Sequence, residues 1–212
     1  MLKRVLSLCV AAMLLVSLLA GCGSYAKLDA LAGTWSTCVD EEDSYILDVL
    51  AFLELYEEEI ALVETSGMQL VRVVEFHKDL TYSFRYDSEA TRTTVRNYLE
   101  SVFLQLYEKR EKLDSLYETS FAMYSQETFL KFYATMYERE TFDELLDAMV
   151  EEVYDYEALD QPYETGTYRI LGDRIYCTKS GETEATYLEY TVTESTLELV
   201  YLEGTEVYQK EA

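Results

Sequence analysis

The feature that most constrains the fold is a run of short segments after Glu164 in which apolar and polar residues alternate. In 188–192, for example, Leu188, Tyr190 and Val192 alternate with Glu189 and Thr191, which is the pattern of a half-buried strand. Tight turns separate these segments at Gly172-Asp173, Ser180-Gly181-Glu182, Glu194-Ser195 and Glu203-Gly204. Five short strands joined in this way predict an antiparallel meander.

Three more strand-like segments lie nearer the N-terminus, at 34–37, 69–77 and 80–86. In the last of them, four apolar or aromatic residues share one face: Leu80, Tyr82, Phe84 and Tyr86. His77-Lys78-Asp79 forms the turn before it. Together with the meander, these segments bring the total to about eight strands.

Helical patterns lie between the two groups of strands and predict an insertion at about 88–160. Apolar residues from Val95 to Leu116 follow three- and four-residue spacing. Ser125 is placed to cap a second helix, and Thr141 with Glu144 forms a capping box for a third. A further helix is expected from Ser44 to about Glu59, with Ile46, Val49, Leu50 and Leu53 facing inward.

The N-terminus has the form of a secretory signal, with Lys3 and Arg4 before an apolar run that ends at Leu19. The sequence Leu19-Ala20-Gly21-Cys22 resembles the lipobox of bacterial lipoproteins. That resemblance implies that residues 1–21 are removed, that Cys22 is acylated on sulfur, and that 22–27 form a tether. No second apolar run approaches the length that crosses a bilayer, so we expect the lipid to anchor the protein to the membrane. We expect the protein to lie in the extracytoplasmic envelope.

The charge of the chain excludes one class of partner. The sequence has 17 Lys and Arg against 41 Asp and Glu, and loss of Lys3 and Arg4 with the signal leaves a net charge of 15 − 41 = −26. Such a chain repels phosphate backbones, so we expect no nucleic-acid binding. Solubility at a crowded surface explains the charge, and a cation or a basic peptide as partner is the alternative.

Several motifs occur in a fixed order along residues 28–212. They are Gly33-Thr34-Trp35, the pair Phe76 and Tyr82, and Gly166-Thr167-Tyr168 followed by Gly172-Asp173. In this order, around a helical insertion, they resemble the bacterial lipocalin-like lipoproteins, a group of uncharacterised function. The resemblance implies an α+β fold: a small antiparallel lipocalin-like β-barrel of about eight strands carrying the insertion at about 88–160.

The resemblance also implies roles for two residues. In lipocalins a Trp plugs one end of the barrel and an Arg near the last strand stacks on it. Trp35 fits the first role, and Lys210 stands where the Arg is expected. An ammonium group is a weaker and less planar partner for an indole than a guanidinium. With this weaker plug, a closed barrel and a partly open barrel both remain alternatives.

Two cysteines remain after processing, Cys38 and Cys177, in a compartment where disulfides form. A disulfide between them and two free thiols both remain open, because the first strand and the second strand of the meander belong to different sides of a closed barrel.

We find no constellation of catalytic or metal-ligating residues in the sequence. His77 is the only histidine, and no His or Cys lies at ligand spacing from it. Runs of acids such as Glu57-Glu58-Glu59 are typical of a solvated face rather than of a paired carboxylate site. We therefore expect a protein that is not an enzyme and that has no metal and no cofactor.

Two functions remain. The first is a surface-tethered protein that binds a small apolar or amphipathic ligand in or at the mouth of the barrel. The second is a non-catalytic structural or interaction module with a filled barrel, whose partner is another envelope protein. The aromatic stretch from Phe121 to Tyr137 either contacts a ligand or forms the seam between the inserted helices. An empty cavity favours the first function and a packed core the second.

Overall fold

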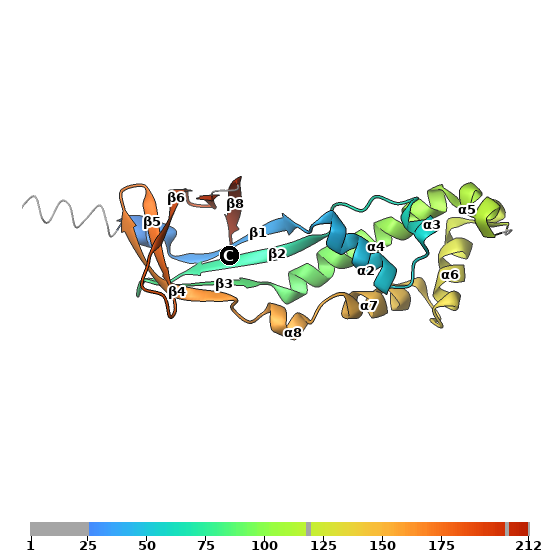
Figure 1. Ribbon diagram of the computed structural model, residues 1–212, viewed down its shortest axis with the longest axis horizontal. Helices are drawn as coiled ribbons and strands as arrows, with labels where there is room; N and C mark the ends of the chain where they lie inside the picture. Colours follow the sequence, from blue (N-terminus) through green and yellow to red (C-terminus); the bar gives the residue numbers. More distant parts are fainter. Residues whose placement is uncertain (1–25, 118–119, 202–203, 212) are drawn as a thin grey trace, which may run out of the picture. The chain divides into compact units, whose positions relative to one another are not determined.

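The computed structural model describes residues 26–117, 120–201 and 204–211, so Cys22 and the predicted signal of residues 1–21 lie outside the described residues. Eight antiparallel strands form a closed barrel, and helices are inserted between strands (Figure 1). The predicted fold class, α+β and lipocalin-like in form, is confirmed. The barrel is closed, which decides between the two forms that the sequence left open.

The strands are β1 (Gly33–Asp40), β2 (Gln69–Phe76), β3 (Thr81–Tyr86), β4 (Glu164–Leu171), β5 (Arg174–Lys179), β6 (Thr186–Val192), β7 (Thr196–Tyr201) and β8 (Gly204–Lys210). The helices are α2 (Asp43–Phe52), α3 (Glu57–Ile60), α4 (Ser88–Glu108), α5 (Arg110–Tyr117), the 3-10 turn η1 (Phe121–Met123), α6 (Gln126–Met136), α7 (Phe142–Val153) and α8 (Tyr156–Leu159).

The chain divides into two compact units. Of the described residues, those within Met1–Thr37, Val73–Phe84 and Pro162–Ala212 belong to the barrel unit, and those within Cys38–Arg72 and Arg85–Gln161 belong to the helical unit. The helical insertion predicted at about 88–160 corresponds to α4 through α8, and the helical unit also contains α2 and α3. β1, β2 and β3 pass along the chain from one unit into the other.

The meander predicted after Glu164 is present as β4 through β8, each strand paired antiparallel with the next. Gly172 turns the chain between β4 and β5 with a φ of 66°, a left-handed conformation that glycine adopts without steric cost. Pairing of β8 with β1, at Trp35 with Lys210 and Ser36 with Gln209, closes the barrel. Closure leaves no open sheet edge among these strands.

The helical unit has a core of its own, built on α4. α7 packs along α4, and α6 contacts both. Asp87 caps α4 by accepting a hydrogen bond from the Ala90 amide. The predicted cap at Ser125 and the capping box of Thr141 and Glu144 are both confirmed.

One predicted helix is wrong in its extent. The segment expected to be one helix from Ser44 to Glu59 forms α2 and α3 with a turn between them. Glu54 in that turn has a φ of 63°, a left-handed conformation that cannot continue a helix. The Leu55 amide then bonds back to the Leu50 carbonyl, at 3.1 Å.

Candidate functional site

The core of the barrel unit is built from large buried side chains. Buried residues from seven strands and from the segment before β1 pack together: Leu31, Trp35, Val74, Phe76, Tyr82, Phe84, Tyr168, Ile175, Cys177, Leu197, Leu199 and Tyr208. The Phe76 ring meets the Tyr168 ring edge-on at 5.1 Å between centroids, and Tyr82 meets Phe84 in the same way at 5.7 Å. Because an eight-stranded barrel is just wide enough for its own side chains, aromatic residues at these positions occupy its interior.

Trp35 is fully buried in this core. Its indole Nε1 donates a hydrogen bond to the Leu31 carbonyl at 2.9 Å. Lys210 Nζ lies over the indole, 4.9 Å from the ring centroid. A side chain at Gly33 would come within 3.2 Å of Lys210 Cε, so the glycine of the Gly33-Thr34-Trp35 motif leaves room for that cation.

Three tyrosines that are buried or partly buried in the two units have carboxylate partners. In the barrel, Tyr82 donates to Glu164 at 2.8 Å. In the helical unit, Tyr154 donates to Glu41 at 2.7 Å, and Tyr133 donates to Glu59. Burial, followed by these carboxylates, raises the pKa of each of the three hydroxyls well above its usual range. The phenols are therefore neutral donors, which is the role of satisfied core polar groups.

The two cysteines predicted to survive processing are both free thiols. Cys38 is exposed, and Cys177 is buried in the barrel core. Burial raises the pKa of Cys177 to about 12. A thiol that stays protonated at neutral pH is a poor nucleophile and a poor metal ligand.

His77 lies in the turn before β3, with half of its side chain exposed and Nε2 3.7 Å from a carboxylate oxygen of Glu75. Within the described part of the chain, no group of three or more His, Cys, Asp and Glu residues is placed to hold a metal ion. No metal-binding group is thus assembled around this histidine by the described residues.

Of the predicted tether, 22–27, only Ala26 and Lys27 are described. They begin a helical segment over 26–31. Lys27 Nζ donates to the carbonyl of Gly172 at 2.6 Å. The searched helices, those of the described residues, are all too short or too polar to cross a bilayer.

The aromatic stretch from Phe121 to Tyr137 belongs to the core of the helical unit. Phe121, Phe129 and Tyr133 are buried there. The rings of Phe121 and Phe132 meet edge-on at 4.9 Å between centroids. Of the two roles considered for this stretch, these contacts favour the seam between helices.

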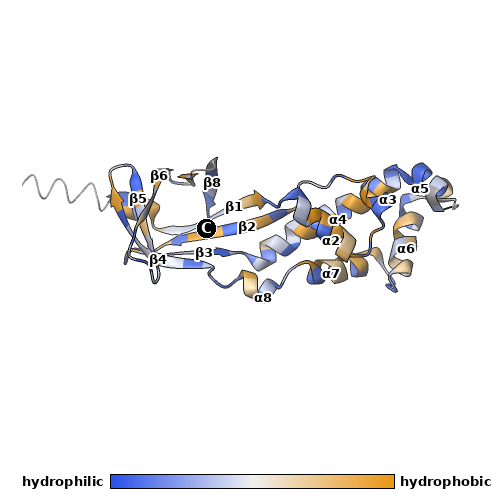
Figure 2. Ribbon diagram, in the orientation of Figure 1, coloured by the Kyte–Doolittle hydropathy of each residue, from blue (hydrophilic) through white to orange (hydrophobic). Residues whose placement is uncertain are grey.

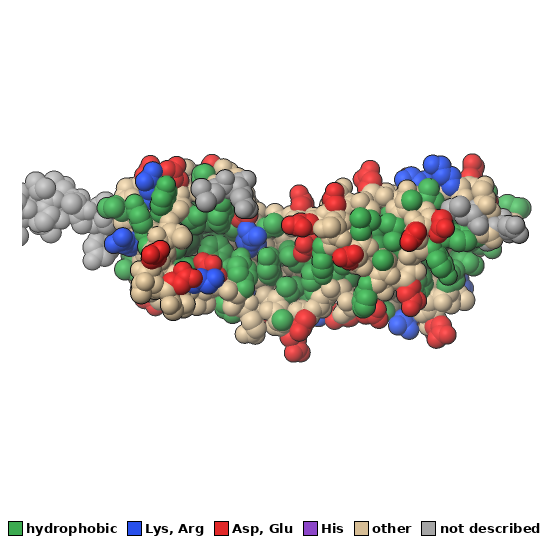
Figure 3. Space-filling model, in the orientation of Figure 1, with side chains coloured by type: hydrophobic (Ala, Val, Ile, Leu, Met, Phe, Trp, Pro, Cys, Tyr) green, Lys and Arg blue, Asp and Glu red, His purple; other side chains and the backbone are tan. Residues whose placement is uncertain are grey.

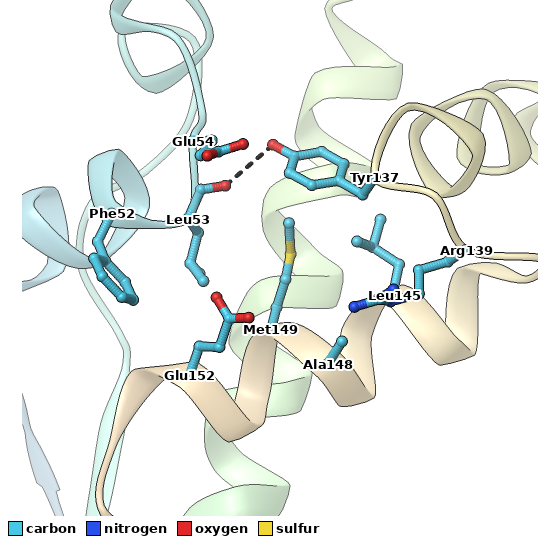
Figure 4. Close-up of a pocket in the computed structure, with 9 residues that line it drawn as sticks. All are labelled: Phe52, Leu53, Glu54, Tyr137, Arg139, Leu145, Ala148, Met149 and Glu152. Atoms are coloured by element: carbon cyan, nitrogen blue, oxygen red, sulfur yellow. Dashed lines mark hydrogen bonds between the residues drawn. The ribbon is translucent and has the colours of Figure 1, made fainter.

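A small pocket lies in the helical unit between the end of α2 and α7, with a volume of about 190 Å³ (Figure 4). Leu53, Leu145 and Met149 give it an apolar floor, and Tyr137 donates to the Leu53 carbonyl at 3.1 Å. Figure 4 shows Phe52 and Glu152 on one side of Met149 and Arg139 on the other. The volume is below the 300–1,000 Å³ usual for small-molecule sites and fits one or two apolar side chains.

An open groove of about 570 Å³ runs along the outer side of α2. Its lining residues come from α2, α3 and the segment after α3: Leu47, Asp48, Ala51, Glu57, Ile60, Ala61, Val63 and Thr65. Most of these side chains are apolar, and the only charged ones are the carboxylates of Asp48 and Glu57. An apolar floor with acidic flanks accepts a group that is apolar on one side and cationic at its edges.

The negative charge of the protein is concentrated in the helical unit. Cys38–Arg72 and Arg85–Gln161 hold 28 Asp and Glu against 9 Lys and Arg, 28 − 9, a net −19 of the −26 expected for the mature chain. Figure 3 shows acidic side chains spread over the visible face of this unit. Four of its acids are engaged by arginines of α4: Arg92 bonds Glu151, and Arg96 contacts Glu100, Asp143 and Asp147.

Comparisons with known proteins found no match: no protein-family model, no curated protein and no solved structure resembles the chain significantly.

The outer side of α2 is the part of the site that sequence reasoning missed. The periodicity identified its inward residues, and Ile46, Val49 and Leu50 are indeed buried. It passed over Leu47 and Phe52, which are 42% and 65% exposed. The signal was present in the sequence, because the helix has apolar residues on every side.

Proposed function

We propose that this protein is a lipid-anchored, non-catalytic interaction protein of the bacterial cell envelope, in which the barrel is a filled scaffold. The observation that supports this most is the packing of the barrel interior by aromatic and aliphatic side chains, among them Trp35, Phe76 and Tyr208. A barrel built to hold a ligand leaves a lined cavity, whereas a filled one contributes stability alone.

The charge and the surface of the helical unit support the same proposal. This unit carries the apolar groove along α2 and most of the net negative charge. Both are properties that a protein partner recognises.

Native mass spectrometry of the mature protein tests the filled barrel. We expect the mass of the polypeptide with its Cys22 lipid, and no further small molecule retained. A co-purified apolar molecule that is lost in a variant of an interior residue, Leu199→Glu, and kept in a variant of the helical pocket, Ala148→Glu, would support the ligand-binding function instead.

The envelope location rests on the Leu19-Ala20-Gly21-Cys22 motif. Replacing Cys22 by Ala removes the sulfur that is acylated. We expect Cys22→Ala either to leave the signal uncut or to release the protein from the membrane fraction. Normal processing and membrane fractionation of this variant would show that the location is wrong.

A further inference from the structure

α2 is apolar on all sides, although one side of it faces solvent. Only three of its residues are not apolar or aromatic: Asp43, Ser44 and Asp48. One side is buried through Ile46, Val49 and Leu50. On the other side Leu47 is 42% exposed and Phe52 is 65% exposed. A helix that is hydrophobic all round is normally covered on all sides, so the outer side of α2 has the composition of a buried surface.

Four of the exposed residues of α2 form one continuous strip. In a helix with 3.6 residues per turn, positions 47, 48, 51 and 52 fall within one arc of about 140°. Leu47, Asp48 and Ala51 line the groove against α3, and Phe52 lines the pocket against α7. Figure 2 shows strongly hydrophobic residues on α2, in contrast to the mostly hydrophilic α5. The groove and the pocket therefore meet along this strip, which we call the α2 face (Leu47, Asp48, Ala51 and Phe52).

Carboxylates lie on the α2 face, at Asp48, and beside it. Asp48 and Glu57 line the groove, and Glu54 and Glu152 line the pocket. Arg139 is the only Lys or Arg among the residues that line the two. An apolar strip with acidic edges is complementary to a partner that has apolar side chains with basic side chains beside them.

The charge decides among the occupants of such a surface. Anionic lipid is repelled by a unit with a net charge of −19, counted as 28 acids against 9 bases. A second copy of this chain would bring the same carboxylates, Asp48 and Glu57, against themselves. A helix with apolar residues at i, i+4 and i+7 and with Lys or Arg beside them satisfies both the groove and its edges.

We propose that the α2 face binds a basic amphipathic helix of another envelope protein. The apolar side chains of that helix enter the groove between α2 and α3, and one of them fills the pocket beside Met149. Its Lys or Arg side chains meet the carboxylates at the edges. This inference rests on the proposed function, for which it names the surface and the class of partner.

The test uses three synthetic peptides and the full mature chain, with binding followed by fluorescence anisotropy. The first peptide is an amphipathic helix with Leu on one face and Lys on the others. The second has Ser in place of Leu, and the third has Glu in place of Lys. We expect the Leu–Lys peptide to bind about tenfold or more tightly than the Leu-to-Ser peptide, and the Glu peptide not to bind.

Variants locate the binding on the protein. Leu47→Ser and Phe52→Ser are expected to weaken binding of the Leu–Lys peptide by about tenfold. Leu171→Ser is the matched control, because Leu171 at the end of β4 is 66% exposed, about as much as Phe52. It should leave the affinity unchanged. Asp48→Asn with Glu57→Gln should weaken binding and reduce its dependence on salt.

Four results would overturn the inference. Equal affinity for the Leu and Ser peptides would show that charge alone attracts them. Equal loss in Leu171→Ser would show that the α2 face is not the site. A dimer in sedimentation that Phe52→Ser dissolves would assign the face to a second copy, and binding to vesicles of anionic phospholipid that Phe52→Ser abolishes would assign it to lipid.

The outcome is distinguishable from failure of the proposed function. A ligand found in the barrel by native mass spectrometry would remove the filled-scaffold proposal and leave the peptide measurements intact. If no peptide binds and no ligand is found in the barrel, only the assignment of the α2 face as the interaction surface is removed.

Discussion

The two units of this protein use their apolar residues differently. The barrel buries most of its large side chains, and some of those left outside have neighbours on the sheet surface. Tyr187, for example, lies 5.9 Å from Tyr176 between ring centroids, with the Arg174 guanidinium 4.5 Å from its own ring. The helical unit has a buried core as well, but it also leaves Leu47 and Phe52 exposed beside an apolar groove. Scattered exposed residues are normal, whereas a strip beside a groove marks a surface for binding.

The units share one device, the burial of tyrosines against carboxylates. Tyr208 donates to Glu206 at 2.6 Å in the barrel, as Tyr133 donates to Glu59 in the helical unit. An acidic chain supplies carboxylate acceptors for several of its buried phenols. These hydrogen bonds therefore link part of the 20 tyrosines to part of the 41 acids of the sequence. The comparison between the units predicts that their cores are similarly stable. It also predicts that their surfaces differ in the exposure of apolar residues to a partner.

The largest expected effect is in the barrel. Trp35→Ala removes a fully buried indole and its hydrogen bond to the Leu31 carbonyl, and should cost about 3–5 kcal/mol in the free energy of unfolding. Denaturant titration measures it. Because Trp35 is the only Trp, its emission should be blue-shifted and poorly quenched by acrylamide in the folded protein. A wild-type melting temperature for Trp35→Ala would contradict the role of this residue in closing the core.

Alkaline pH should destabilise both units. Burial raises the pKa of Tyr98 in the helical unit, and of Tyr168 in the barrel, to about 12. An unfolded tyrosine titrates near pH 10, so above that value the folded state binds more protons than the unfolded state. The contribution of each tyrosine to the free energy of unfolding is therefore fully present below about pH 10. It falls between about pH 10 and 12, by about 1.4 kcal/mol per pH unit for each group.

The slope of unfolding free energy against pH, measured by urea titration from pH 9 to 12, checks this. Tyr98→Phe and Tyr168→Phe should each reduce the slope, whatever they do to stability at neutral pH. An unchanged slope in Tyr168→Phe alone would show that Tyr168 does not titrate as Tyr98 does, which would break the likeness of these two core positions.

Loss of a hydrogen bond to a carboxylate should cost more than loss of one to a carbonyl. Tyr133→Phe leaves an oxygen of the buried Glu59 without its phenol, and we expect about 1.5–3 kcal/mol. Tyr137→Phe removes a bond to the Leu53 carbonyl in the same unit and should cost about 0.5–1.5 kcal/mol. Equal costs in thermal unfolding would mean that the charge of Glu59 adds nothing to the bond.

Gly166→Ala should cost about 1–3 kcal/mol through overpacking of the barrel wall. A Cβ at this position would lie 2.2 Å from the Thr178 carbonyl oxygen and 2.8 Å from Tyr82 Cε1. Since the first contact is with backbone, a second change, Tyr82→Ala, should not restore stability. Thr167→Ala, an exposed neighbour, is the control and should stay within about 0.5 kcal/mol of wild type. A stable Gly166→Ala protein would show that β4 and β5 separate easily.

Local patterns predicted much of this fold, because alternation, turns and caps are encoded by neighbouring residues. The β4–β8 meander and the caps at Ser125 and Thr141 follow from such patterns. Leu80 was placed wrongly in the strand, on one face with Tyr82 and Phe84: it lies in the turn, with a φ of 68° and 43% exposure. Alternation alone does not show where a turn ends and a strand begins.

The packing of residues that are far apart in the chain could not be predicted from the sequence. The division into two units depends on which apolar residues cluster together, as the separate cores around Phe76 and Phe103 show. The α2 face was missed for a related reason. When a helix has apolar residues on every side, periodicity indicates an inward side, but it does not show that the apolar residues on the other side stay exposed. Only the packing of α2 shows that Leu47 and Phe52 are left uncovered.

The smallest expected effect is on the α2 face, and it sharpens the comparison most. Phe52→Ser should change the free energy of unfolding by less than about 0.5 kcal/mol, because 65% of this side chain is exposed and Phe and Ser have similar helix propensities. On the same helix, Leu50→Ala should cost about 2–5 kcal/mol, because Leu50 is fully buried. Chemical denaturation of the two variants measures the difference between the sides of one helix. A cost of about 2 kcal/mol for Phe52→Ser would mean that the protein itself covers this side in solution, and the α2 face would then belong to the core rather than to a partner.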